Sequence, residues 1–186
     1  MYHYLQNEKL VILLLFLISV IVRIPAIHLY GDTSIDNEWG IIVYNLTEYG
    51  MFAFRNLDGF LLPNLYMPPL YPLFLYFFTI FNLNENNYIL LILYVQLFLS
   101  ATSVVIFYQI NKKIFSKNIS ILSSLLLSLF PLYIYACSQI SSITLQVFLT
   151  ILFIYSFFEF SENKKSKSIF LLSITSGLLI LLRGEF

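Results

Sequence analysis

The chain has 186 residues, of which 59% are hydrophobic and 18% aromatic but only 11% are charged. A soluble domain carries roughly 25% charged residues and leaves about a third of its unfolded surface in contact with solvent. This composition therefore excludes a soluble fold and predicts an all-α integral membrane protein. Ten Lys and Arg balance ten Asp and Glu, which excludes the basic surface that nucleic-acid binding needs. The single cysteine, Cys137, excludes a disulfide within the chain and a cysteine-based metal site.

Apolar runs of about 20 residues, the length that crosses a bilayer, divide the chain into five predicted spans. The first is interrupted only by Arg23, and no small-residue cleavage pattern follows it, so we interpret it as an anchor and not a removed signal peptide. The third and fourth share one uncharged run, whose most polar point, 138–142, predicts the turn between them. The predicted spans are 10–30, 88–110, 119–138, 142–158 and 168–183.

The run Gly59–Asn84 is also uncharged, but we predict that it lies in the membrane interface. Its prolines remove backbone donors where lipid offers no other partner. Without a pass here, Lys9 and the lysine clusters at 112–117 and 164–167 fall on one face, as the positive-inside rule favours. The amino terminus is therefore predicted to be cytoplasmic, and residues 31–87 form one acidic external loop whose only cation is Arg55.

Apolar residues recur at helical spacing in the first part of this loop, which predicts an amphipathic helix lying along the interface. Thr33 or Ser34 is the expected cap at its start, and Gly50 can end it in a left-handed conformation. The apolar stripe consists of Ile35, Trp39, Ile42, Val43, Leu46 and Tyr49.

Two carboxylates, Asp36 and Glu38, fall in the first turn of the predicted helix. There they interact favourably with the helix dipole, so compensation of that dipole is one interpretation of the pair. The other interpretation is catalysis. A helical step of ~100° per residue turns the two side chains about 160° apart. We therefore expect one to face a reacting centre and the other to hold the loop or a metal.

Five short motifs, in this order along the chain, resemble the polyprenyl-phosphate-sugar glycosyltransferases of the GT-C type. The similarity is closest to the RgtA/B/C/D-like group, which is related to protein mannosyltransferases and aminoarabinose transferases. The motifs are Asp36-x-Glu38-Trp39 with Asn45-Leu46 and Gly50-Met51-Phe52; Met67-Pro68-Pro69-Leu70-Tyr71-Pro72; Lys112-Lys113-Ile114-Phe115; Leu129-Phe130-Pro131; and Leu181-Leu182-Arg183-Gly184.

This resemblance implies a multi-span GT-C-like bundle in the plasma membrane that moves a sugar from a polyprenyl phosphate to an extracytoplasmic glycolipid, polysaccharide or protein. Asp36 is then the general base, Glu38 a second carboxylate and possible ligand of Mg or Mn, and the anomeric carbon inverts. Arg55, Arg183 and Arg23 are candidates to contact the donor phosphate. The alternatives are an ion pair with Asp58 for Arg55, interfacial anchoring for Arg183, and snorkelling to the interface for Arg23.

The sequence departs from the family pattern in two places. Ser141 and Ser142 stand where family members often carry an acid at the external end of the fourth span. Tyr66 and Met67 stand where aminoarabinose transferases place an acid and a lysine, which argues against that substrate. We expect residues 1–186 to be the amino-terminal part of a single transmembrane GT-C domain whose remainder is missing, so that the fragment alone is inactive. A transporter or flippase fragment and a structural membrane subunit are the other hypotheses.

Overall fold

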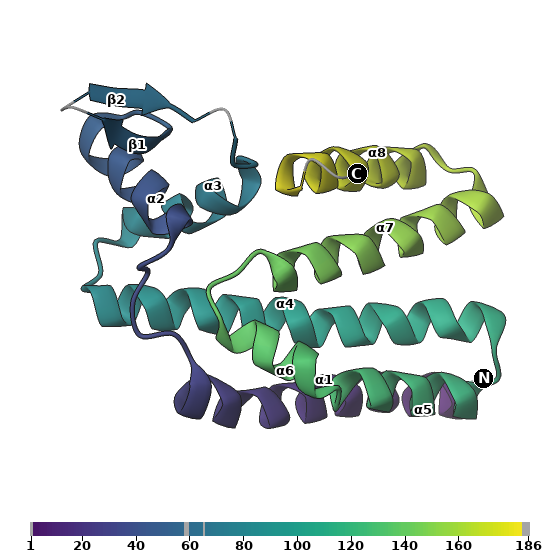
Figure 1. Cartoon of the computed structure of the whole chain (residues 1–186). Helices are drawn as coiled ribbons and strands as arrows, with labels where there is room; N and C mark the ends of the chain where they lie inside the picture. The colour runs from purple at the N-terminus through teal and green to yellow at the C-terminus, as the bar shows by residue number, and fades with distance from the viewer. Residues whose placement is uncertain (1, 58–59, 65, 184–186) are drawn as a thin grey trace.

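The structure, a computed structural model, describes residues 2–57, 60–64 and 66–183, with residues 2–7 and 55–57 described as backbone alone. Long helices run side by side, and the segment between the first two of them packs at one end of this bundle (Figure 1). The elements are α1 (Tyr2–Tyr30), α2 (Glu38–Tyr49), β1 (Ala53–Leu57), β2 (Phe60–Pro63), α3 (Leu70–Phe77), the 3-10 helix η1 (Phe78–Phe81), α4 (Glu85–Ile114), α5 (Lys117–Ser128), α6 (Pro131–Ser138), α7 (Ile143–Asn163) and α8 (Ser166–Leu182).

Each predicted span coincides with a helix or a helix pair. Three helical segments, Glu8–Tyr30, Glu85–Ile114 and Ile143–Asn163, are long and apolar enough to cross a membrane. The third predicted span is the pair α5 and α6, which qualifies when taken together but is bent by 49°. The last predicted span is α8, which is apolar but has 17 residues, fewer than the ~20 that cross a bilayer at right angles. A fifth crossing therefore stays a prediction.

The bend between α5 and α6 has a covalent cause. Pro131 has no backbone N–H to donate, and in a continuous helix its ring would clash with the carbonyl group four residues earlier. The helix therefore stops at Ser128 and restarts with Pro131 in its first turn, a position where proline is favoured. The carbonyl groups at the end of α5 consequently need other donors.

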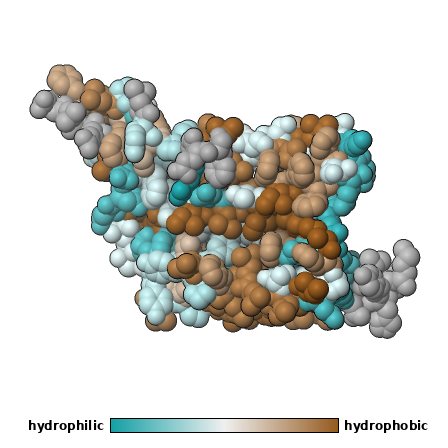
Figure 2. Space-filling view, turned by 45° about the vertical axis from the view of Figure 1, so that its right-hand side comes forward, coloured by the Kyte–Doolittle hydropathy of each residue, from teal (hydrophilic) through white to brown (hydrophobic). Residues whose placement is uncertain are grey.

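The central helix of the bundle is α4, which packs against α1, α5 and α7. Its buried residues Ile92, Leu93 and Leu97 join Leu149 of α7 and Leu179 of α8 in one apolar core. Apolar side chains also cover much of the outer face of the bundle, and hydrophilic ones gather towards its two ends (Figure 2). An apolar exterior between polar ends is the arrangement that suits a lipid bilayer.

The helical part of the predicted interfacial segment, Leu70–Phe81, is shorter than the ~20 residues that cross a bilayer. Residues 60–81 form the strand β2, the eight-residue helix α3 and the turn η1. β2 pairs antiparallel with β1, a hairpin that the helical spacing did not predict. The side chain of Asn45, a residue of the GT-C-like motif, is buried and donates to the Ala53 carbonyl at 3.0 Å, which fastens this hairpin to α2.

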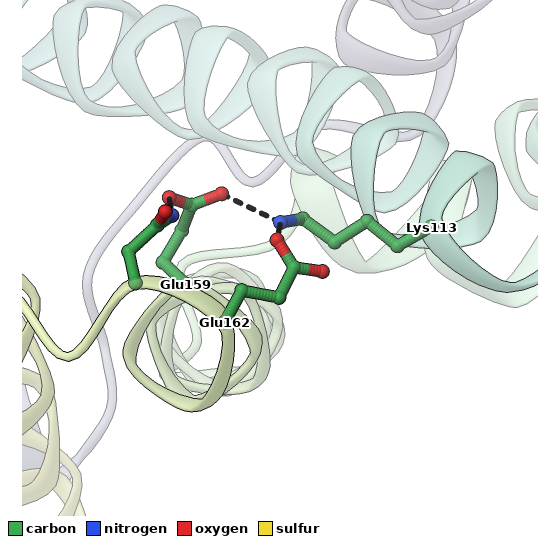
Figure 3. Close-up of polar contacts among 4 residues, drawn as sticks. Lys113, Glu159 and Glu162 are labelled. Atoms are coloured by element: carbon green, nitrogen blue, oxygen red, sulfur yellow. Dashed lines mark hydrogen bonds and ion pairs between the residues drawn. The ribbon is translucent and has the colours of Figure 1, made fainter.

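Lysine side chains at the opposite end of the bundle link the helix ends to one another. Lys113 Nζ lies 2.7 Å from Glu159 Oε1 and 2.5 Å from Glu162 Oε2, so one cation on α4 holds two carboxylates on α7 (Figure 3). Lys112 also pairs with Glu8 of α1. These contacts fix the register of α1, α4 and α7 at that end.

We expect Lys113→Ala to lower the free energy of unfolding by about 1 kcal/mol, because it leaves the partly buried Glu159 and the exposed Glu162 facing each other without their cation. Thermal unfolding in detergent measures the change, and high salt should reduce it. Lys167→Ala, at an exposed position, is the control and should change nothing. Equal unfolding of the two variants would show that the network is dispensable.

Candidate functional site

The helix α2 begins two residues beyond Asp36. Its cap is Asn37, whose Oδ1 accepts the N–H of Gly40 at 3.1 Å, so the expectation of a cap at Thr33 or Ser34 was wrong. Asn37 has an extended backbone, and the chain before it folds back so closely that a Cβ on Gly40 would meet the Ile35 carbonyl oxygen at 2.1 Å. The predicted end is confirmed, because Gly50 has a φ of 65°.

The two candidate carboxylates are both exposed. Asp36 precedes the cap, and its Oδ2 accepts a 2.5 Å hydrogen bond from the Ser34 hydroxyl. Glu38 is the first residue of α2. The carboxylates therefore occupy different local environments, one in the turn before the helix and one in the helix.

The start of the loop that follows α1 is fastened to the turn between α6 and α7. Asp32 Oδ2 accepts the Ile140 N–H at 2.6 Å, and the Asp32 N–H donates to the Ser138 carbonyl at 3.1 Å. Gln139 Nε2 donates to the Tyr30 carbonyl at 2.6 Å. Asp32 was assigned no role from the sequence beyond its contribution to the acidic charge of the loop. Its partner is a backbone group more than 100 residues away, and no sequence pattern marks that contact.

A buried pair, Tyr71 and Gln96, extends this network towards α3. The Tyr71 hydroxyl donates to Gln96 Oε1 at 2.9 Å, and Gln96 Nε2 donates to the Gln139 carbonyl at 2.8 Å. Burial, followed by the nearby carboxylate of Asp32, raises the pKa of Tyr71 well above its usual range, so the phenol stays protonated and remains a donor. The Trp39 ring packs edge-on against Tyr71 with centroids 5.0 Å apart.

Trp39 and Arg183 face one cleft at this end of the bundle. The cleft has a volume of about 200 Å³, and Arg183 is the one charged residue among the described residues that line it. Trp39 belongs to the first of the five motifs and Arg183 to the last, so the fold brings residues of these two distant motifs to one cleft. The lining residues are Trp39, Met67, Pro68, Tyr71, Ser142, Leu182 and Arg183.

The third candidate cation, Arg23, lies inside the bundle, about two helical turns before the end of α1. Its side chain is fully buried, which contradicts the alternative of snorkelling to the interface. Nε donates to the Ser100 hydroxyl at 2.7 Å, and Nη1 donates to the Ser19 and Ser128 carbonyls at 2.9 and 3.1 Å. Tyr133 lies under the guanidinium, 5.2 Å from ring centroid to Cζ. The structure thus places Arg23 apart from the cleft that holds Arg183.

The model of the dolichyl-phosphate-mannose-protein mannosyltransferase family matches residues 66–185, more than half of the chain. The chain belongs to this family. It is therefore a membrane glycosyltransferase of the GT-C type, as the motifs predicted. No curated protein and no solved structure matches it.

The match to the mannosyltransferase family covers α3 to α8 and includes Arg183, whereas Asp36 and Glu38 lie before it. Their roles, and that of Arg55, stay predictions. Arg55 is paired with Leu62 in the hairpin, but its side chain lies outside the described residues, as does Asp58. Among residues 2–57, 60–64 and 66–183, no group of three His, Cys, Asp or Glu is placed to hold a metal ion.

Proposed function

We propose that this mannosyltransferase-family protein transfers a sugar from a polyprenyl-phosphate donor to an extracytoplasmic acceptor at the loop end of its bundle. The family acts in general on lipid-linked sugars and extracytoplasmic acceptors. The observation that carries the proposal is the cleft between Trp39 and Arg183, because it sets a cation beside the residue that directly follows the Asp36–Glu38 pair.

In the proposed mechanism, Arg183 holds the phosphate of the donor and stabilises the charge that develops on it. Asp36 accepts the proton of the acceptor hydroxyl while that oxygen forms its bond to the anomeric carbon. The bond from the anomeric carbon to the phosphate oxygen breaks on the opposite face, and its electron pair leaves with the lipid phosphate. Attack from the opposite face inverts the anomeric configuration. Glu38 orients the loop or binds a divalent cation.

The orientation in the membrane is part of the proposal. Lysines 112, 113, 117, 164, 165 and 167 lie at helix ends on the side of the bundle opposite the loop (Figure 1). We assign that end to the cytoplasm, since positive residues are retained there. The loop with Asp36 and the cleft with Arg183 then face the outside of the plasma membrane.

Removal of Arg183 is expected to weaken donor binding. Trp39 is the single tryptophan of the chain and lines the same cleft, so its fluorescence reports binding without any reaction. For Arg183→Ala, we expect the Kd for a sugar-free polyprenyl phosphate to rise about 10- to 100-fold, because the variant loses one hydrogen bond to a charged group. Arg183→Lys should recover part of the affinity, and Lys167→Ala should match the wild type. An unchanged Kd in Arg183→Ala would remove Arg183 from the mechanism.

A flippase that moves the lipid-linked sugar without breaking its bond is the second candidate. The bent helix pair α5–α6 at Pro131 and the buried Arg23 favour it, because transporters place broken helices and polar groups within the bilayer. Sugar transfer from labelled donor separates the two, since a flippase leaves the label on the lipid.

A further inference from the structure

A second cavity opens at the loop end, between the end of α1 and the start of α4. Its volume is about 330 Å³, at the lower end of the ~300–1,000 Å³ that small-molecule sites occupy. It shares no lining residue with the cleft of Trp39 and Arg183. Its lining residues are Ile27, His28, Gly31, Asp32, Thr33, Asn86, Ile89, Leu90 and Leu93.

The polar groups in this lining are hydrogen-bonding groups for hydroxyls. Asp32 uses Oδ2 for the Ile140 N–H, and its Oδ1 has no hydrogen bond among the described residues. Thr33 and Asn86 are exposed side chains that can both donate and accept. His28 Nε2 lies 3.1 Å from the Tyr94 hydroxyl. Buried apolar residues, including Ile27 and Ile89, complete the wall. A sugar ring, with apolar C–H faces and a rim of hydroxyls, matches this combination.

The charges of the two cavities are opposite. Asp32 is the one formally charged residue among the described residues that line the second cavity. Arg183 is the one formally charged residue among those that line the first cleft. A carboxylate repels a phosphate at close range and accepts hydroxyl hydrogen bonds. A phosphate is therefore favoured near Arg183 in the first cleft and disfavoured near Asp32 in the second cavity.

We propose that the second cavity binds a neutral carbohydrate, the acceptor of the transfer reaction. The assignment as acceptor rests on the proposed function, while the carbohydrate site itself does not. Asp32 connects the two cavities through one short segment, because it bonds Ile140, and Ser142, two residues further on, lines the first cleft. A carbohydrate bound at Asp32 would thus lie on the same scaffold as a phosphate bound at Arg183.

Cysteine labelling tests the site without any reaction. In the full-length protein, Cys137→Ser removes the one cysteine of this chain, which is buried, and Thr33→Cys then places a thiol in the cavity wall. Thr47→Cys is the matched control, because Thr47 is also an exposed threonine of the external loop but does not line the cavity. A membrane-impermeant maleimide labels each variant with and without methyl mannoside, or with glucose 6-phosphate.

We expect saturating methyl mannoside to slow labelling of Thr33→Cys at least threefold, and glucose 6-phosphate to protect far less. Thr47→Cys should label at one rate throughout. Adding Asp32→Asn should raise the half-protecting concentration of methyl mannoside about tenfold, the loss of one charge-assisted hydrogen bond. Its labelling rate without ligand should stay unchanged, because Asn can still accept from the Ile140 N–H.

Labelling of Thr33→Cys at its full rate in methyl mannoside would overturn the site, as would equal protection by the phosphorylated sugar. These outcomes differ from failure of the proposed function. Protection without any sugar transfer would leave a carbohydrate site in a protein that is not a transferase of lipid-linked sugars. Transfer without protection would place the acceptor elsewhere.

Discussion

Replacing Asp36 by Asn is expected to reduce sugar transfer by a factor of about 10² to 10⁴, the usual contribution of a positioned general base. An amide cannot take the proton of the attacking hydroxyl at any pH of interest. The amide oxygen can still accept the 2.5 Å hydrogen bond from Ser34, so the turn before α2 should keep its shape. The loss should therefore fall on kcat, with donor binding, read from Trp39 fluorescence, unchanged.

The matched control is Glu48→Gln, because Glu48 is an exposed acid in the last turn of α2, the helix that Asp36 precedes. It should retain full activity. Glu38→Gln separates the two carboxylates. A smaller loss than in Asp36→Asn would agree with a supporting role, and a larger one would exchange their assignments. Wild-type turnover by Asp36→Asn would eliminate Asp36 as the base.

Arg23→Ala is expected to destabilise the protein by about 3 kcal/mol, more than the loss expected for Lys113→Ala. The substitution removes a large side chain from a filled interior, and it leaves the Ser128 carbonyl without its donor. That carbonyl belongs to the end of α5, where the proline break has already removed the helical donors. The guanidinium also provides a cation at the negative end of the α5 dipole.

Unfolding of detergent-solubilised protein measures this effect. Arg23→Lys keeps the charge but has no planar fork of donors, so we expect about half of the loss. Lys167→Ala, at an exposed lysine, should be neutral. Stability equal to wild type in Arg23→Ala would show that the α5–α6 break holds without this contact. If Arg23→Ala keeps wild-type stability but binds the donor more weakly, Arg23 contacts the donor phosphate after all.

Local signals in the sequence predicted much of the fold. Span length and hydropathy located the long helices, and Gly50 marked the end of α2. The uncharged run 118–158 was divided at its polar point, and the structure has a turn there, 139–142, in which three of the four residues are polar. The bend between α5 and α6 at Pro131 was not predicted, because residues 119–138 were interpreted as one span.

Contacts between distant segments were not predictable in this way. The cap of α2 is Asn37 and not the predicted Thr33 or Ser34. The Asn37 side chain also donates to the Ile140 carbonyl at 3.4 Å, a distant partner that a local capping pattern cannot reveal. Asp32 acquires its position from the same turn. Arg23 was a candidate for contact with the donor phosphate, with snorkelling to the interface as the alternative, whereas hydroxyls and carbonyls from three helices hold it inside the bundle. Each of these differences involves a hydrogen bond between residues that lie about 80 or more positions apart in the sequence.

The most direct measurement is the fate of a sugar that is labelled on its polyprenyl phosphate and added to membranes containing the full-length wild-type protein. The proposed function predicts that the label leaves the lipid for a water-exposed acceptor, with the anomeric configuration of the new linkage inverted relative to the donor. A label that stays on the lipid, while the lipid crosses to the other leaflet, would contradict sugar transfer and establish the flippase instead.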